Sequence, residues 1–278
     1  NHAAKEVRDY SRALKAGFKL VKENGYLITR HLIQIQEFLE KNHAGLRKLP
    51  GTVIQNPSTK EIMHTPPQKH DEIVELMGNL EEYINNDSDD IDPLIKMAVI
   101  HYQFESIHPF YDGNGRTGRI INVLYLVLKG LLDIPVLYLS RYIIKHKSKY
   151  YKLLQKVRTE NNWEDWILYM LEGVEITARE TIILIEKIKE LMAKTEIILK
   201  TEIPKIYTKD LLEILFLHPY TKIEFLVKHL GVSRQTASTY LEKIEKAGVL
   251  KKEKIERYNF YINVRLFDLL SFPENLNT

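Results

Sequence analysis

The chain of 278 residues contains no cysteine. It therefore has no disulfide bond and no thiolate metal site, which predicts a reducing, cytoplasmic setting. No apolar run approaches the roughly 20 residues that a membrane-spanning helix needs, and no signal peptide is visible. The formal net charge of +3 is too small by itself to indicate nucleic-acid binding. The content of 28% charged and 44% hydrophobic residues predicts a soluble globular protein with room for two domains.

The most informative segment runs from His108 to Arg119 and reads HPFYDGNGRTGR. Residues 92–107 before it predict a helix with Asp92 as its N-cap. Pro109 disfavours helical geometry at the residue before it, so this helix should end there. Residues 120–128 predict a second helix that is almost wholly apolar. The segment is therefore a glycine-rich loop between two buried helices.

The loop has the composition of a phosphate site. Gly113 and Gly115 permit backbone angles that turn successive N–H groups toward one anion. The start of the following helix adds its dipole and its unpaired donors. Arg116 and Arg119 lie three residues apart and can each bind phosphate oxygens through two N–H groups. Each feature alone is common in ordinary turns and surfaces, but their combination predicts a bound polyphosphate.

Two further residues of the segment suit a transfer reaction. Asp112 is a hard oxygen ligand for Mg²⁺, which also needs phosphate oxygens to complete its shell. His108 can accept the proton of an attacking hydroxyl, and the carboxyl end of a helix favours the resulting cation. Because phosphoryl-type transfer depends mostly on positioning and charge neutralisation, these residues supply the parts that it needs.

The segment matches the Fic motif H-x-F-x-[DE]-G-N-G-R-x-x-R at every specified position, so the chain resembles the Fic family. Most Fic proteins move AMP from ATP to a hydroxyl of a target protein and release pyrophosphate. The resemblance implies a mainly α fold with a β-hairpin flap, ATP as substrate, and Mg²⁺ as cofactor. It makes His108 the general base and Asp112 the metal ligand. It assigns ATP binding to Asp112, Gly113, Asn114, Gly115, Arg116, Thr117, Gly118, Arg119 and Tyr150.

Residues 49–67 predict the flap, with a turn at residues 56–59. In Fic proteins the backbone of the target pairs with the exposed edge of this hairpin. The resemblance gives that docking role to Gly51, Thr52, Val53 and Ile54. An open strand edge suits an extended peptide, although a surface hairpin without a function is the alternative.

Two other stretches resemble parts of Fic proteins. Residues 140–142 and 148–151 resemble the helical region beside the adenine, with Tyr150 as its neighbour; Arg158 stands where relatives often have asparagine. The chain lacks the inhibitory pattern [S/T]-x-x-x-E-[G/N], yet residues 3–7 resemble the stretch that follows it. We therefore expect that the native protein has this helix upstream and that the present chain is de-repressed.

The sequence predicts a Fic domain over residues 1–200, a winged helix-turn-helix domain over residues 205–270, and a tail at 271–278. The start of the recognition helix would carry Ser233, Arg234, Gln235, Thr236 and Ser238. Such domains bind DNA, bind other proteins or form homodimers, and the nearby acidic residues repel phosphate. The choice stays open at this point.

The leading functional prediction is transfer of AMP to a serine, threonine or tyrosine hydroxyl of a target protein or of the chain itself. One alternative keeps the Fic scaffold but transfers another phosphate-linked group or removes AMP. The other is a DNA-binding transcriptional regulator whose Fic domain senses nucleotide, which predicts salt-dependent DNA binding that ATP changes.

Overall fold

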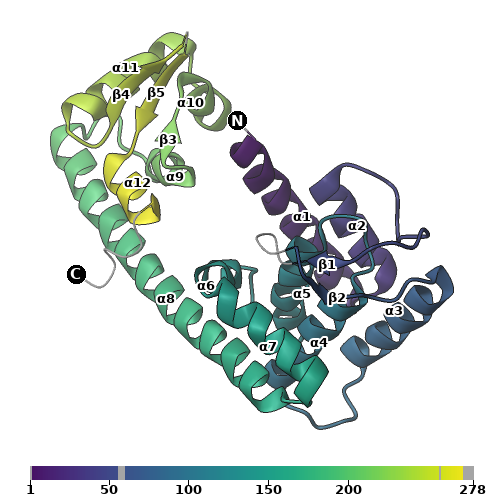
Figure 1. The fold of residues 1–278 in the computed structure, drawn as a ribbon. Helices are drawn as coiled ribbons and strands as arrows, with labels where there is room; N and C mark the ends of the chain where they lie inside the picture. The colour runs from purple at the N-terminus through teal and green to yellow at the C-terminus, as the bar shows by residue number, and fades with distance from the viewer. Residues whose placement is uncertain (1, 56–59, 257, 272–278) are drawn as a thin grey trace. The chain divides into compact units, whose positions relative to one another are not determined.

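The computed structural model describes residues 2–55, 60–256 and 258–271. Helices dominate these residues and are accompanied by two small antiparallel sheets, which confirms the predicted mainly α class (Figure 1). Contacts divide the chain into two compact units, Asn1–Ala178 and Arg179–Thr278. The predicted turn at 56–59 and nearly all of the predicted tail lie outside the described residues.

The first unit is a helical domain with a short hairpin. Its elements are α1 (His2–Asn24), α2 (Thr29–Glu40), β1 (Ile54–Gln55), β2 (Ile62–His64), α3 (His70–Asn85), α4 (Pro93–Ile107), α5 (Asn114–Leu128), α6 (Leu139–Lys145), α7 (Lys147–Glu160) and the start of α8 (Trp163–Glu202). Left-handed residues separate successive helices in this unit. Gly25 (φ 74°) separates α1 from α2, and Asn161 (φ 53°) separates α7 from α8.

Helices α4 and α5 form the centre of this unit. Their side chains are buried on nearly all sides, because α4 contacts α3 and α5, while α5 also contacts α1 and α2. Close packing leaves no space at Gly17 of α1, where an added Cβ would lie 2.5 Å from Leu124 Cδ1. The surrounding helices therefore explain why both sequences are nearly continuous in apolar residues.

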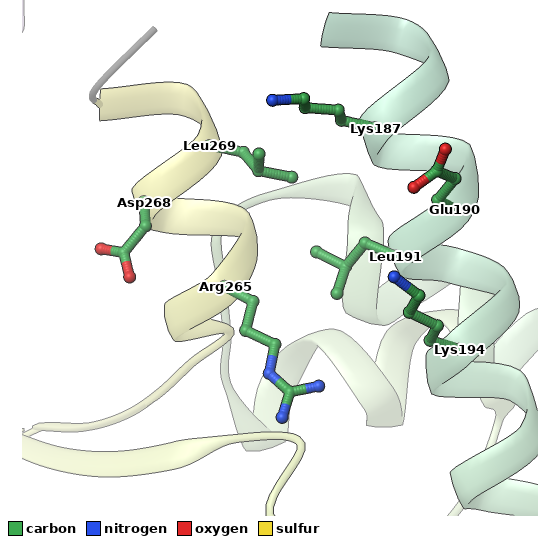
Figure 2. A pocket seen from close by; sticks show the side chains of 7 residues that line it. All are labelled: Lys187, Glu190, Leu191, Lys194, Arg265, Asp268 and Leu269. Carbon is green, nitrogen blue, oxygen red and sulfur yellow. The ribbon is translucent and has the colours of Figure 1, made fainter. Parts of the chain in front are cut away.

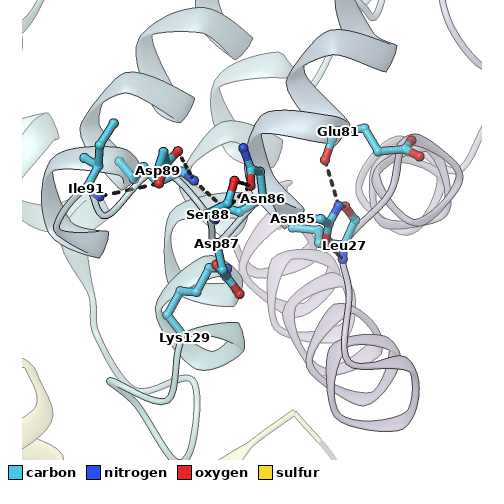
Figure 3. A network of polar contacts seen from close by, with 10 residues as sticks. Leu27, Glu81, Asn85, Asn86, Asp87, Ser88, Asp89, Ile91 and Lys129 are labelled. Atoms are coloured by element: carbon cyan, nitrogen blue, oxygen red, sulfur yellow. Dashed lines mark hydrogen bonds and ion pairs between the residues drawn. The ribbon is translucent and has the colours of Figure 1, made fainter.

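The connection between α3 and α4 is held by a polar network (Figure 3). Asn85 Nδ2 donates to the Leu27 carbonyl at 2.8 Å, and Asn85 Oδ1 accepts from the Leu27 N–H at 3.0 Å. Lys96 Nζ, whose residue is 2% exposed, donates to Asp89 Oδ2 at 2.7 Å. The acidic loop 86–92 is thus neutralised from the core side, which fixes the start of α4.

The second unit has its own core and sheet. Its elements are the remainder of α8, α9 (Lys209–Leu217), β3 (Tyr220–Thr221), α10 (Ile223–Leu230), α11 (Arg234–Lys246), β4 (Lys251–Ile255), β5 (Tyr258–Ile262) and α12 (Val264–Ser271). The antiparallel sheet of this unit has three strands in the order β3-β5-β4. This order of elements accommodates a winged helix, and that assignment stays a prediction.

The expected domain boundary at residues 200–205 differs from the division by contacts. Helix α8 is continuous from Trp163 to Glu202, and its Leu199 is fully buried in the second core. The units consequently separate within the helix, after Ala178. None of the described helices is both long and apolar enough to cross a membrane.

Helices α8 and α12 border a cavity of about 510 Å³ in the second unit (Figure 2). The charged side chains that line it are Lys187, Glu190, Lys194, Arg265 and Asp268. Cations and carboxylates alternate around this cavity, so its lining selects neither sign of charge.

Candidate active site

His108 ends α4 in the left-handed conformation (φ 48°, ψ 58°), and its N–H donates to the Phe104 carbonyl at 2.9 Å. Pro109 then directs the chain out of the helix, as the sequence predicted. The imidazole is half-buried, and its Nδ1 has no hydrogen-bond partner among the described residues. That Nδ1 is itself buried, and a neutral imidazole keeps one ring nitrogen that can accept a proton.

Burial lowers the pKa of His108 to about 4, and the nearby Arg47, His64 and Arg158 add to this effect, while a hydrogen bond to the Glu105 backbone opposes it. The imidazole is therefore neutral at pH 7 and can act as a base. A polyphosphate bound nearby would raise this pKa, because an anion stabilises the imidazolium.

Arg47 fixes the backbone around His108. Its side chain is fully buried, Nε donates to the His108 carbonyl at 2.8 Å, and Nη2 donates to the carbonyls of Ile107 (3.3 Å) and Pro67. Its own N–H donates to the Pro109 carbonyl at 2.9 Å. One guanidinium thus satisfies the end of α4 and joins it to the end of the hairpin. The sequence analysis missed this residue, because a lone arginine among surface-like neighbours gives no signal.

The glycine loop has the expected geometry at the start of α5. Gly113 has φ 82°, and its carbonyl accepts the first helical hydrogen bond from Thr117 at 2.9 Å. Asn114 is 3% exposed and bonds both backbone groups of Phe110, at 2.9 and 2.8 Å. The asparagine holds the loop closed, while the first turn of α5 presents N–H groups that have no partner within the helix.

The two arginines of the segment lie against different elements. Arg116 Nη2 is 2.5 Å from Glu40 Oε1 at the end of α2, and Nη1 is 3.3 Å from Glu6 Oε1 on α1. Arg119 Nε donates to Ser140 Oγ at 3.1 Å. The two guanidinium groups therefore approach the start of α5 from different directions.

Glu105 adds a buried carboxyl to the same region. It is 8% exposed, its Oε1 has no partner among the described residues, and desolvation raises its pKa to about 7 although Arg119 and Arg158 lower it. Arg158 Nε is also buried without a partner there. Unsatisfied buried polar atoms are rare in folded proteins, and those of Glu105, His108 and Arg158 gather around the end of α4. Such a gathering of perturbed groups marks a candidate site.

Asp112 is exposed at the mouth of the loop, and its Oδ1 accepts from the Gly113 N–H at 2.7 Å. The described residues contain no group of three or more His, Asp or Glu that could hold a metal ion. A Mg²⁺ ion here would consequently draw most of its ligands from phosphate oxygens and water, which is its usual mode with nucleotides. The donor set fits a metal that arrives with its substrate.

Thr117 and Gly118 lie in the core side of α5. Thr117 is fully buried. A Cβ at Gly118 would lie 2.6 Å from Glu105 Oε1 and 3.1 Å from Phe104 Cδ1. Both positions serve the close packing of α5 on α4, and their contribution to ATP binding stays a prediction.

The predicted hairpin is present but shorter than expected. Its strands pair antiparallel, with Ile54 opposite His64. Of the four predicted docking residues only Ile54 lies in a strand. The irregular stretch from Gly51 to Val53 is clamped by Gln68, which accepts from the Gly51 N–H at 2.7 Å and donates to the Thr52 carbonyl at 3.0 Å. His64 Nε2 lies 2.8 Å from the Ser106 carbonyl, so β2 is anchored beside the end of α4.

Residues 26–126 match the model of the Fic/DOC family. The chain carries a Fic/DOC domain. Residues 191–266 match a second model, described as the C-terminal domain of SoFic-like protein adenylyltransferases. The first match lies within the first unit, and the second match covers the greater part of the second unit.

Relatives of known name support the same assignment. The proteins named "Protein adenylyltransferase Fic" from Drosophila virilis and Drosophila willistoni are 31% and 27% identical over 177 residues. These matches cover 62% of this chain and 35% and 34% of those proteins, so the chain spans about a third of the length of the curated relatives it matches.

Solved structures show the fold. A Fic family protein from Desulfovibrio desulfuricans G20 superimposes with a TM-score of 0.52 at 20% identity, over 91% of this chain and 74% of that one. Fic-1 (aa134–508) from C. elegans gives a TM-score of 0.51 at 22% identity, over 66% and 52% of the two chains.

The two adjacent tyrosines of α7 have different surroundings. Tyr150 is buried, its hydroxyl lies 2.9 Å from His101 Nε2, and its ring lies 5.6 Å from that of Trp166. Tyr151 is exposed and lines a cavity between α7 and the flap. Tyr150 as adenine neighbour stays a prediction, and Tyr151 is the tyrosine that faces open space.

The predicted recognition-helix residues make contacts within the second unit. Ser233 caps α11 by accepting from the Thr236 N–H at 3.1 Å. Arg234 pairs with Glu224 at 3.2 Å, and Ser238 Oγ donates to Glu242 at 3.3 Å. Gln235 accepts from Thr239 Oγ1 only through its backbone carbonyl. These contacts stabilise the helix itself, and DNA binding stays a prediction.

Proposed function

We propose that the Fic domain transfers AMP from ATP to a serine, threonine or tyrosine hydroxyl of a target protein, or of the chain itself. The observation that carries the proposal is a half-buried, neutral imidazole at the end of α4 beside a glycine-formed helix start. Two arginines and one exposed carboxylate complete that surface. The names of the relatives from Drosophila support the same reaction.

The residues divide the work as follows. His108 accepts the proton of the target hydroxyl, whose oxygen then attacks the α-phosphorus of ATP. The bond from the α-phosphorus to the oxygen that bridges to the β-phosphorus breaks, and pyrophosphate leaves with that electron pair. The backbone donors of α5, together with Arg116 and Arg119, bind the phosphate charges. Because these donors are held in place by Asn114 and Ser140, little reorganisation is needed during the reaction.

Asp112 would hold Mg²⁺ together with the phosphate oxygens, and the metal would neutralise charge on the leaving group. Arg116 reaches phosphate only by exchanging its contact with Glu40, so the paired carboxylate and the phosphate compete for one guanidinium. The flap supplies the edge on which an extended target segment pairs, beside His108.

The decisive experiment incubates the protein with Mg²⁺ and ATP labelled at the α-phosphate, alone and with candidate target proteins, next to His108→Ala. A parallel reaction contains ATP labelled at the γ-phosphate. AMP transfer predicts protein-bound label from the α-phosphate alone, and loss of that label in His108→Ala. Label from the γ-phosphate would instead indicate transfer of another group, and loss of label from a target already carrying AMP would indicate removal.

A further inference from the structure

A cavity of about 850 Å³ lies between the flap and α7 in the first unit. The flap contributes Gln55 from β1 and Met63 from β2, and Tyr151 contributes a wall from α7. Met63 directly precedes His64, whose Nε2 contacts the Ser106 carbonyl at 2.8 Å beside the end of α4. The cavity therefore continues from the hairpin that borders the candidate base.

The remaining lining is strongly basic. Lys145, Lys147, Lys152 and Lys156 line the cavity, and the carboxylate among its described lining residues is Glu160. Lys156 is neutralised by Asp165 at 3.2 Å. Lys145, Lys147 and Lys152 are exposed and form no ion pair within the described part of the chain. One wall of the cavity thus carries three cations without a carboxylate partner.

ATP itself does not account for these cations. Its phosphates have the start of α5, Arg116 and Arg119 in the proposed reaction, and its base is uncharged. Lysine ammonium groups gathered on one wall repel one another, and a bound anion relieves that repulsion. These exposed lysines, which have no carboxylate partner among the described residues, therefore suit a second anionic ligand next to the nucleotide.

We propose that this lysine wall, defined as Lys145, Lys147 and Lys152, binds acidic side chains of the target segment. The inference rests on the proposed function, because it places the target hydroxyl at His108 and the target backbone along the flap. Residues next to the modified hydroxyl then lie over the cavity, where glutamate or aspartate side chains meet the three ammonium groups. The substrate class is a hydroxyl residue within an acidic segment.

The test uses two fluorescent peptides that each contain one serine. In one peptide the serine is flanked by glutamate and aspartate, and in the other by glutamine and asparagine. Fluorescence anisotropy measures binding to the intact protein over a range of salt concentrations, without ATP. The variant Lys145→Glu/Lys147→Glu/Lys152→Glu reverses the wall, and Lys15→Glu/Lys22→Glu/Lys69→Glu makes the same change of net charge at exposed residues that do not line the cavity.

The acidic peptide should bind roughly tenfold more tightly than the neutral one, which is the factor that three exposed ion pairs of ordinary strength supply. This preference should weaken as salt rises and disappear in the wall variant but not in the control variant. Equal binding of the two peptides, or equal loss in both variants, would overturn the inference. A wall variant that weakens ATP binding instead, measured by calorimetry, would assign the lysines to the nucleotide and overturn it as well.

Transfer of label separates this inference from the proposed function. If the acidic peptide binds through the lysine wall but neither peptide nor any target protein accepts AMP, the binding surface is supported and the proposed AMP transfer is contradicted. If both peptides accept AMP at equal rates, the proposed AMP transfer is supported and the preference for acidic segments is contradicted.

Discussion

At the scale of single residues, the site separates a group that handles a proton from groups that hold charge. His108 has an unpaired nitrogen and a pKa lowered to about 4, while Arg119 is fixed by Ser140 beside the glycine loop. His108 can act on the target hydroxyl, and Arg119 can act on ATP. Mutations at the two positions should therefore have different effects.

We expect His108→Ala to abolish AMP transfer while ATP still binds, because the imidazole meets the nucleophile and not the phosphates. Arg119→Ala should weaken ATP binding by roughly tenfold or more, since a guanidinium–phosphate contact is charge-assisted. Isothermal titration calorimetry with ATP and Mg²⁺ measures ATP binding, and incorporation of label from the α-phosphate of ATP measures AMP transfer. Equal loss of ATP binding in the two variants would contradict this division.

Glu105 predicts a pH-dependent effect on stability. Its pKa in the folded protein is about 7, above the ordinary value of 4.5, so the folded state holds the proton more tightly than the unfolded state between these values. Stability therefore falls as the pH rises through this range, and the full cost is present above pH 7.

Glu105→Gln removes that cost. The variant should be more stable than the parent protein at pH 8, by roughly 1–3 kcal/mol, and the difference should shrink toward pH 4.5. Urea denaturation at both pH values measures this difference in the free energy of unfolding. The lowered pKa values of His101 and His108 give the opposite slope, but both proteins share them, so they cancel in the comparison. A difference independent of pH would contradict the assignment.

At the scale of elements, the site depends on how α4, α5 and the flap are joined. The end of α4 is connected to the flap by Arg47 and by His64, and the start of α5 is closed by Asn114. Gly118 lets α5 approach α4 closely enough to bring Glu105 against the backbone of α5. Each of these contacts fixes the backbone next to a candidate reacting group.

Arg47→Met should be destabilising by about 3 kcal/mol, because it keeps much of the buried volume but leaves several carbonyls without donors. AMP transfer should also fall although His108 is intact, since the backbone of His108 loses its support. Arg30→Met, at an exposed position, is the control and should change stability by less than about 0.5 kcal/mol. Denaturation and label incorporation measure the two effects, and equal stability of both variants would contradict the role of Arg47.

At the scale of the whole molecule, every residue of the candidate active site lies in the first unit. The second unit has a separate core that includes Leu199, Leu226 and Tyr261. Trp166 and Met170 of α8 belong to the first core, which therefore keeps them if the chain stops after Ala178.

A chain that ends at Ala178 should fold and bind ATP within about twofold of the full protein, because a domain with its own core is stable by itself. Circular dichroism checks the fold and calorimetry checks ATP binding. A folded fragment that no longer binds ATP would show that the second unit completes the site.

The sequence by itself determined what is local along the chain. The order from His108 to Arg119 predicted the helix end at His108 and the left-handed Gly113, because neighbouring residues decide backbone angles. Helix α5 begins at Asn114, earlier than the predicted residue 120, so Gly115 is helical and lacks a left-handed angle. The apolar periodicity likewise predicted the helix over residues 92–107 and the apolar part of α5, while the resemblance implied the mainly α class.

Only the tertiary structure decided which distant groups meet. Arg47, Glu40 and His64 contact the site from positions tens of residues away, so no local pattern could show them. Successive residues of a helix differ in direction by about 100°, so packing decides which of two adjacent tyrosines is buried. Tyr150 packs in the core and Tyr151 lines the cavity for that reason. The lysine wall lines the same cavity because α6 and α7 face the flap there.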